Sequence, residues 1–298
     1  MDQFKSGFVA LIGKPNVGKS TLLNSILASK VAITTSKPQT TRDNIRGILT
    51  KQDCQIVFID TPGIHNPKAK LNQLMVANAY KTISDVDIIL YLIDASKPLD
   101  KGDSIICQYL AKVDKPKFLI VNKIDKLMKS ELIDLLESLD STIFDEVIPI
   151  SGLKSDNIDE LIETIKKYLT DNQQYYPADM ISDYPENFIV SEIIREKIMI
   201  NTSQEIPHCI AVVIDKMEKK KNSYYIQATI ICERESQKSI IIGKGGQMLK
   251  KVGTFAREEL QQRFNCPVYL ETFVIVEENW RNKRYQLQQL GYYNKDDE

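Results

Sequence analysis

The first half of the chain alternates apolar runs with segments in which apolar residues recur every three or four positions. The runs predict strands at 7–13, 45–51, 54–60, 87–94, 117–121 and 147–150, and the periodic segments predict helices at 19–28, 70–82, 101–112, 130–138 and 156–169. This alternation is typical of a mostly parallel sheet covered on both faces. We therefore expect a doubly wound α/β domain over residues 1–170, with its ligands at the carboxyl ends of the strands.

The second half has a different pattern. It predicts a helix at 188–200, strands at 210–215, 224–232 and 268–276, a charged turn at 219–222, and a helix at 247–264 that follows a shorter helical piece. The resulting α-β-β-α-α-β order indicates a smaller α+β domain over 188–298. Residues 171–187, which include Pro177 and Pro185, are expected to link the two domains, with their tyrosines packed against one of them.

Length and composition agree with two globular domains, since the chain has 298 residues and a formal net charge of -1. The five cysteines are odd in number and show no C-x-x-C spacing, which predicts free thiols in a reducing cytoplasm rather than a disulfide framework or a zinc site. No apolar run approaches the roughly 18 residues of a membrane span, and we expect no cleaved signal. We expect a cytoplasmic monomer.

Candidate chemistry begins with the string Gly13-Lys14-Pro15-Asn16-Val17-Gly18-Lys19-Ser20, which is followed by Thr21. It fits the phosphate-loop pattern G-x-x-x-x-G-K-[ST] and stands between a predicted strand and a predicted helix, as that pattern requires. The loop amides would surround the β-phosphate at a helix N-terminus. Lys19 would bridge the β- and γ-phosphates, and Ser20 would bind Mg²⁺.

The string Asp60-Thr61-Pro62-Gly63 follows an apolar strand. Asp60 is placed to complete the Mg²⁺ shell, and the Gly63 amide to reach the γ-phosphate. Taken alone, the string could be a simple turn. Ile64 stands where many signalling GTPases carry a glutamine that orients water, and isoleucine cannot do so; we therefore expect slow intrinsic hydrolysis.

The string Asn122-Lys123-Ile124-Asp125 also follows a predicted strand. Asp125 can accept hydrogen bonds from N1–H and the exocyclic amine of guanine, a donor pair that adenine lacks, so discrimination on the order of 10⁴ is expected. Alone, this string could be a polar turn. Ser151-Gly152-Leu153 resembles the loop whose backbone amide contacts the guanine carbonyl in GTP-binding proteins with these strings, although the middle residue of their usual pattern is alanine. Together the strings predict a pocket for Mg²⁺-bound GTP.

Near the carboxyl end, Gly243, Lys244, Gly245 and Gly246 form a G-x-x-G loop between two predicted helical pieces. With the preceding strings, this loop makes the chain resemble, from Gly7 to about Gly291, the Era family of bacterial GTPases that carry a carboxyl-terminal type II KH domain. The resemblance implies binding near the 3′ end of 16S ribosomal RNA, assistance to assembly of the small (30S) ribosomal subunit, and peripheral association with the inner face of the cell membrane. It also implies a first switch at 33–46 whose magnesium ligand is Thr41, with Thr40 as the alternative. A second switch is expected to begin at Asp60 and to move with Gly63 as contacts to the γ-phosphate form and break.

The glycine loop has a physical basis for RNA binding that does not depend on the resemblance. Glycines allow a sugar-phosphate backbone to approach closely, and a helix N-terminus favours phosphate. Residues 187–298 hold 17 Lys and Arg against 15 Asp and Glu, so any basic track must be local. We expect cations at Lys244, Lys250, Lys251 and 219–221, and an apolar face for the bases at Ile241, Ile242 and Val213.

The predicted site is therefore defined by residue. Lys19, Thr41 and Gly63 are the catalytic candidates; Ser20, Thr41 and Asp60 are the metal ligands; the nucleotide contacts are Gly13, Lys14, Pro15, Asn16, Val17, Gly18, Lys19, Ser20, Thr21, Asp60, Thr61, Pro62, Gly63, Ile64, Asn122, Lys123, Asp125, Ser151, Gly152 and Leu153; and the RNA contacts are Gly243, Lys244, Gly245, Gly246, Lys250 and Lys251. GTP or GDP and Mg²⁺ are the expected cofactors. Asn16 is compatible with a K⁺ ion near the phosphates or with a loop hydrogen bond. Two other classes stay open: a protein- or membrane-directed signalling GTPase with a KH-like tail, and a P-loop kinase that uses ATP.

Overall fold

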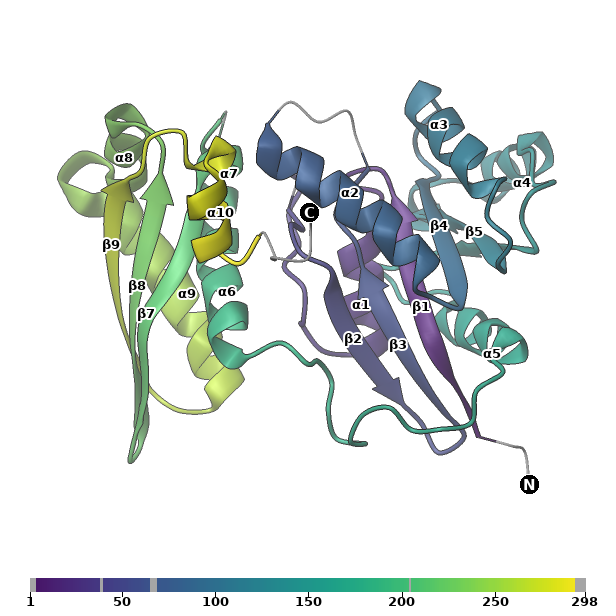
Figure 1. Ribbon diagram of the computed structural model, residues 1–298, viewed down its shortest axis with the longest axis horizontal. Helices are drawn as coiled ribbons and strands as arrows, with labels where there is room; N and C mark the ends of the chain where they lie inside the picture. Colours follow the sequence, from purple (N-terminus) through teal and green to yellow (C-terminus); the bar gives the residue numbers. More distant parts are fainter. Residues whose placement is uncertain (1–3, 38–39, 65–68, 204, 293–298) are drawn as a thin grey trace. The chain divides into compact units, whose positions relative to one another are not determined.

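The structure, a computed structural model, describes residues 4–37, 40–64, 69–203 and 205–292. Its contacts divide the chain into two units (Figure 1). The first unit comprises Met1–Ala32, Thr41–Pro67 and Met75–Asp183, and the second comprises Ile33–Thr40, Lys68–Leu74 and Tyr184–Glu298. Each unit is built around a sheet of its own.

The sheet of the first unit has six strands in the order β2-β3-β1-β4-β5-β6. Their bounds are β1 Lys5–Gly13, β2 Ile45–Thr50, β3 Cys54–Asp60, β4 Ile88–Asp94, β5 Lys117–Asn122 and β6 Glu146–Ile150. Only β2 runs antiparallel to its neighbour among these six strands. Every residue of β3 and β4 is buried, as expected for central strands with both faces covered. Because β1 has β3 on one side and β4 on the other, the strand order reverses at β1, which is where ligands bind in such folds.

Among the described residues, five helices accompany this sheet: α1 Lys19–Leu27, α2 Lys70–Ser84, α3 Lys101–Leu110, α4 Lys129–Ser138 and α5 Ile158–Tyr168. The first residues of α2, up to Leu74, are grouped with the second unit. One core cluster joins alternate residues of β1, such as Ala10 and Ile12, to apolar residues of α2, α3 and α4. A short 3₁₀ turn, η1 Ile124–Lys126, follows β5. The doubly wound fold predicted from the sequence is confirmed.

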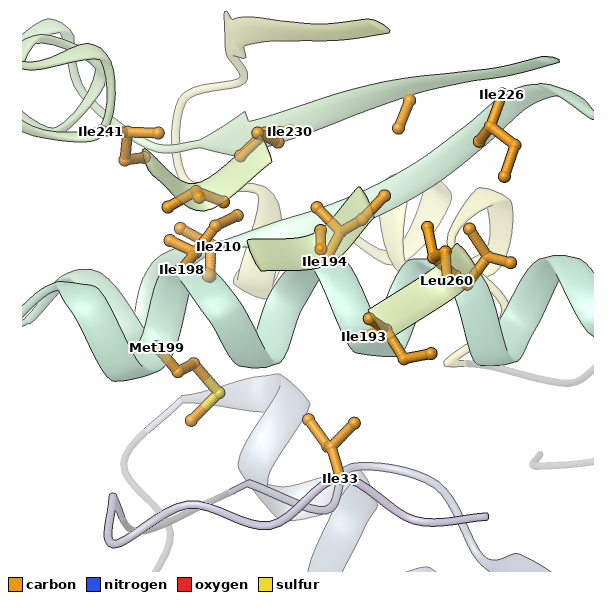
Figure 2. Packing of buried hydrophobic residues seen from close by; sticks show 14 of the residues in the cluster. Ile33, Ile193, Ile194, Ile198, Met199, Ile210, Ile226, Ile230, Ile241 and Leu260 are labelled. Atoms are coloured by element: carbon orange, nitrogen blue, oxygen red, sulfur yellow. The ribbon is translucent and has the colours of Figure 1, made fainter. Parts of the chain in front are cut away.

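The second unit contains a three-stranded sheet in the order β7-β8-β9, with β7 Ala211–Lys220, β8 Ser223–Cys232 and β9 Val268–Val276. β7 and β8 form an antiparallel hairpin, and β9 returns parallel to β8 after a helical crossover. Its helices are α6 Glu186–Asn201, α7 Ile206–Cys209, α8 Glu235–Ile242, η2 Lys244–Gly246, α9 Gln247–Phe264, η3 Trp280–Asn282 and α10 Arg284–Gln289. Figure 2 shows its core, in which isoleucines of α6 meet residues of β7, β8 and α9. The predicted α-β-β-α-α-β order is confirmed, with α7 inserted after the first helix.

The carboxyl-terminal segment after β9 closes the second unit. Trp280 is fully buried, and its indole Nε1 donates a hydrogen bond of 2.9 Å to the carbonyl of Cys209. Arg281 donates to the carbonyl of His208 at 3.2 Å and to Glu233 at 2.5 Å. The described part of the tail is therefore a fixed element of this unit.

Residues 171–183, which form most of the predicted linker 171–187, are held by the first unit. The Gln55 side chain accepts hydrogen bonds from the backbone N–H groups of Tyr175 and Tyr176 at 2.7 and 2.9 Å. The ring of Tyr175 also packs on Phe8, with centroids 4.9 Å apart. Tyr184 instead contacts Phe188 of the second unit. The tyrosines were expected to pack against one domain; instead, Tyr175 and Tyr176 bind residues of the first unit and Tyr184 packs in the second.

Candidate functional site

The phosphate loop runs from the end of β1 to the start of α1. Gly18 has φ 101°, and a Cβ there would lie 2.3 Å from the side-chain nitrogen of Asn122. A Cβ on Gly13 would lie 2.6 Å from the carbonyl oxygen of Leu92. Both glycines are therefore required by the path of the chain, because a side chain at either position would meet a neighbouring loop or strand.

Lys19 is buried at the base of this loop. Its Nζ donates to the carbonyl oxygens of Gly13 and Lys14, each at 3.1 Å, so the ammonium group lies under the loop. Burial lowers the pKa of Lys19 to about 8, although the Asp60 carboxylate opposes that shift. A buried cation surrounded by carbonyl groups lacks a full counter-charge, and the anionic phosphates of a nucleotide would supply it.

Three oxygen-bearing side chains meet next to the loop. The Ser20 hydroxyl donates to Asp60 Oδ2 at 2.5 Å and lies 2.8 Å from the Thr41 hydroxyl, which is 3.3 Å from the same carboxylate oxygen. Asp60 is fully buried, and burial raises its pKa to about 6. Its other oxygen, Oδ1, has no hydrogen-bond partner within the described part of the chain. Hard oxygen donors with an unused carboxylate oxygen fit Mg²⁺, which prefers one or two protein carboxylates and completes its shell with phosphate and water.

The second predicted switch begins at Asp60 and lies against the phosphate loop. The Thr61 hydroxyl donates to the carbonyl of Leu11 at 2.7 Å, and the Ile64 amide donates to the carbonyl of Gly13 at 3.1 Å. A Cβ on Gly63 would lie 2.7 Å from the backbone nitrogen of Pro15, so a residue with a side chain would push the two loops apart. The Ile64 side chain is buried in the core, away from any water it would have to orient.

The predicted base site is organised by Asn122, which joins three loops. Its side-chain nitrogen donates to the carbonyl of Val17 at 2.8 Å, while its oxygen accepts from the amides of Lys123 and Gly152 at 2.8 and 2.9 Å. The Ser151 hydroxyl donates to Asp125 Oδ1 at 2.6 Å. The two predicted base-recognition strings therefore lie together beside the phosphate loop.

Gly152, the departure from the usual alanine, lies against α1. An added Cβ would be 3.3 Å from Leu22 Cα, which is tighter than an ordinary van der Waals contact. Leu153 next to it is largely exposed. The glycine thus lets this loop approach the first helix closely.

Sequence reasoning missed Asp94 and the pair Asp100 and Asp103. Lys123 Nζ donates to Asp94 at 2.7 Å and to the carbonyl of Asn16 at 2.5 Å, which ties the base loop to the phosphate loop. Burial opposes ionisation of Asp94, but hydrogen bonds from Lys123 and Ser96 hold its pKa below the usual value. A signal was present, because Asp94 ends an apolar strand as Asp60 does.

Lys14 of the phosphate loop is held by α3. Its Nζ bonds Asp100 at 2.8 Å and Asp103 at 2.6 Å, and Asp103 also accepts the Tyr91 hydroxyl at 2.8 Å. Burial works against the charged form of Lys14, yet these carboxylates raise its pKa above the ordinary value. The Lys14 side chain therefore positions the loop from outside.

The glycine loop of the second unit joins α8 to α9. Gly243, Gly245 and Gly246 have φ of 73°, 59° and 78°, the left-handed region that favours glycine. A Cβ on Gly243 would lie 2.7 Å from Met248 Cβ, whereas nothing lies within 4 Å of a Cβ on Gly245 or Gly246. The first glycine is thus required by packing, and the other two leave an open backbone surface.

The expected cations beside this loop are exposed, since Lys244, Lys250 and Lys251 all lie at the surface. Two of the three residues expected to receive bases do not lie there. Ile241 is fully buried in the core because the phase of α8 turns it inward, and Val213 lines a separate hollow with Trp280 and Tyr285. Those two expectations were wrong; Ile242 remains partly exposed.

Comparisons with known proteins agree with this architecture. A family model described as a 50S ribosome-binding GTPase matches residues 8–123, and a KH domain model matches residues 205–281. The crystal structure of Era in complex with MgGDPNP and nucleotides 1506–1542 of 16S ribosomal RNA is 41% identical, with a TM-score of 0.94, and the match covers 98% of this chain and 100% of that one. Era from Aquifex aeolicus, crystallised as a variant with GDP and AlF₄⁻, gives 41% identity, the same coverage and a TM-score of 0.93.

Fold and site together define a P-loop GTPase with a carboxyl-terminal KH domain. Identity of this size over nearly the whole length shows more than a shared fold. The chain belongs to the Era family, and the family predicted from the sequence is confirmed. No helix in the described ranges is long and apolar enough to cross a membrane.

Proposed function

We propose that this protein binds and hydrolyses GTP, binds 16S ribosomal RNA near its 3′ end through the KH domain, and assists assembly of the 30S subunit. The observation that carries the proposal is the cluster of Ser20, Thr41 and Asp60 beside the buried Lys19, in a chain that also presents an open glycine loop. The Era structure with MgGDPNP and 16S RNA supports both halves, because its match spans both domains. The small subunit is the partner we infer, since the RNA in that structure belongs to it.

In the nucleotide pocket, Ser20, Thr41 and Asp60 would hold Mg²⁺, which when bound neutralises charge on the β- and γ-phosphates. Lys19 and the loop amides hold the phosphate oxygens, and Gly63 brings a backbone amide toward the γ-phosphate. Asp125 selects guanine, while Asn122, Ser151 and Gly152 hold its loop in place. The other nucleotide contacts predicted from the sequence belong to these same loops.

Hydrolysis itself depends on positioning and charge stabilisation more than on covalent chemistry. Because the Ile64 side chain is buried and apolar, the described switch offers no group at that position to orient water. We propose slow intrinsic turnover. We also propose that a K⁺ ion beside Asn16 accelerates GTP hydrolysis. Equal hydrolysis rates in KCl and NaCl at matched ionic strength would refute this role for K⁺.

On the RNA side, we propose that Gly245 and Gly246 face the sugar-phosphate backbone, with Lys244, Lys250 and Lys251 supplying cations and Gly243 shaping the turn. We place the domain limits at 1–170 and 188–298, joined by 171–187. Location in the cytoplasm and peripheral association with the membrane remain predictions; co-flotation of the protein with vesicles of anionic lipid would test the latter.

Two measurements on purified, nucleotide-stripped protein test the proposal. Calorimetry with Mg²⁺ should show a strong preference for GTP and GDP over ATP and ADP, and equal affinities would refute the nucleotide half. Titration of a labelled RNA carrying the 3′ end of 16S rRNA should show tight binding that weakens steeply with salt. A scrambled RNA that binds equally well would refute the RNA half and favour a protein- or membrane-directed GTPase.

A further inference from the structure

Ile33, Thr34 and Thr40 of the predicted first switch contact residues of the second unit. Ile33 is buried in the core of that unit, and Figure 2 shows its side chain directed toward α6, near Met199 and Ile193. The backbone N–H of Thr34 donates to Glu196 Oε1 of α6 at 3.0 Å. Residues 33–40 are accordingly grouped with the KH domain, while Thr41 is grouped with the GTPase domain.

Arg195 of α6 fixes the end of this segment. Its side chain is 1% exposed, and its guanidinium is paired with the Glu192 carboxylate through Nε at 2.6 Å. A terminal nitrogen also donates to the carbonyl oxygen of Thr40 at 2.5 Å. That carbonyl oxygen belongs to the peptide bond between Thr40 and Thr41. Arg195 therefore fixes this peptide bond, and the side-chain hydroxyl of Thr41, the residue that follows it, lies 2.8 Å from the Ser20 hydroxyl.

The same part of α6 is connected to the helix that follows the glycine loop. Glu196 accepts a hydrogen bond from Lys197 at 2.8 Å, and Lys197 is also ion-paired with Glu259 of α9. Glu196 is 2% exposed, so this network lies in low dielectric, where its geometry is strongly enforced. A displacement of Thr34 or Thr40 would therefore disturb buried charged groups of α6, one of which is linked to α9 through Lys197.

We propose that Arg195 is a positioning residue for GTP: it holds the Thr40–Thr41 peptide so that the Thr41 hydroxyl can complete the metal shell. GTP and GDP differ at the γ-phosphate, and Thr41 acts only where that phosphate and the metal are in place. Arg195 thus stabilises the GTP-bound state from within the KH domain and leaves GDP binding unaffected. This inference rests on the proposed role of Thr41.

The test compares GDPNP and GDP binding in the full-length protein with Mg²⁺. Because loss of Arg195 alone would leave Glu192 buried and unpaired, the main variant is Glu192→Gln/Arg195→Met, which removes both charges. We expect GDPNP affinity to fall by about tenfold or more, the range for a lost hydrogen bond to a charged donor, with GDP affinity unchanged. Single-turnover GTP hydrolysis should slow by a similar factor. The single variant Arg195→Lys keeps the charge, so its GDPNP affinity and its hydrolysis rate should lie between those of the double variant and the wild-type protein.

Glu233→Gln/Arg281→Met provides the matched control, because Arg281 also pairs with a largely buried carboxylate and a carbonyl of the second unit but contacts no switch residue among the described ones. It should leave the ratio of GDPNP to GDP affinity unchanged. If the ratio of GDPNP to GDP affinity were unchanged in Glu192→Gln/Arg195→Met, the inference would be overturned and the proposed function would stand. If the wild-type protein bound neither nucleotide, the proposed function itself would be refuted.

Hydrogen exchange on the wild-type protein tests the same inference without a variant. GDPNP, but not GDP, should slow exchange in peptides that cover residues 33–41 and 192–199. Equal protection by the two nucleotides would also overturn it, even if the double variant fails to fold.

Discussion

The Ser20 hydroxyl and the Asp60 carboxylate, 40 residues apart in the chain, are joined by a hydrogen bond of 2.5 Å. Ser20 lies in the first turn of α1 at the end of the phosphate loop, and Asp60 ends β3. Strand β3 lies beside β1 in the sheet, which brings the two residues together. The ligands expected to bind Mg²⁺ are therefore already assembled, and a metal ion would replace the hydrogen bond rather than rearrange the backbone.

The first prediction concerns the pH dependence of magnesium binding. Burial raises the pKa of Asp60 to about 6 in the nucleotide-free protein, so below that pH the carboxyl is protonated and a poor ligand. The affinity for MgGDP should fall as the pH decreases through 6, by about tenfold for each further pH unit. Calorimetry at pH 7.5, 6.5, 5.5 and 5.0 would measure it.

Because the phosphates of GDP also titrate in this range, Asp60→Asn is the control. The variant should bind MgGDP more weakly at pH 7.5 and show only the pH dependence of the nucleotide. If wild type and variant gave parallel curves, Asp60 would not be the titrating ligand.

The second prediction separates charge from shape at the glycine loop. Gly245 has φ 59°, and a Cβ there meets no atom within 4 Å. Aspartate and asparagine both tolerate this conformation, so Gly245→Asp and Gly245→Asn should fold alike. Gly245→Asp should weaken binding of the 16S 3′-end RNA by about tenfold or more through repulsion of phosphate, while Gly245→Asn should lose much less.

Fluorescence titration at two salt concentrations would measure both variants. Gly243→Asp is unsuitable for this purpose, because its Cβ would collide with Met248 and any loss could reflect misfolding. Wild-type affinity in both Gly245 variants would show that RNA does not approach this loop.

Elements with a long apolar pattern could be predicted from the sequence, and elements stabilised by one distant contact could not. Strand β3 was predicted at its observed bounds because the sequence there contains a clear apolar run. In the structure all seven of its residues are buried. Helix α7 has only four residues, too few for any periodicity. The indole N–H of the buried Trp280 is paired with the carbonyl of Cys209, 71 positions earlier. Patterns within a window of about 18 residues cannot reveal such contacts.

The candidate site shows the same limit. Its phosphate and base loops were predictable because each follows a strand and carries a motif whose chemistry is local. The Arg195 to Thr40 hydrogen bond spans 155 positions and leaves no local signal, since an arginine on a helix is ordinarily exposed. Ile241 was misassigned for a related reason: three consecutive isoleucines look alike until the helix phase buries one of them.

The third prediction concerns Asp94. Asp94→Asn should release Lys123 from its ion pair and loosen the link between the base loop and Asn16. Because this link serves both loops and no γ-phosphate contact, GDP and GDPNP affinities should fall together, by about tenfold. Asp53→Asn, which breaks an ion pair with Lys166 elsewhere in the same unit, should leave both unchanged. A selective loss of GDPNP binding would contradict this role for Asp94.

The fourth prediction concerns the choice of base. Asp125 Oδ1 accepts the Ser151 hydroxyl at 2.6 Å, so one carboxylate oxygen is fixed and the plane of the group is set by the protein. Asp125→Asn replaces an acceptor with an amide donor, which leaves the guanine amine unmatched and suits the 2-carbonyl of xanthine. GDP affinity should fall by on the order of 10² or more, and XDP affinity should rise.

Competition between GDP and XDP for the nucleotide-stripped variant would measure the change. Ser151→Ala is the matched control, because it loosens the carboxylate without changing its chemistry and should weaken GDP binding modestly with no gain for XDP. If Asp125→Asn still preferred GDP over XDP by the wild-type ratio, recognition of the base would have to lie with other groups of the pocket, and the specificity for guanine would lose its physical basis at this residue.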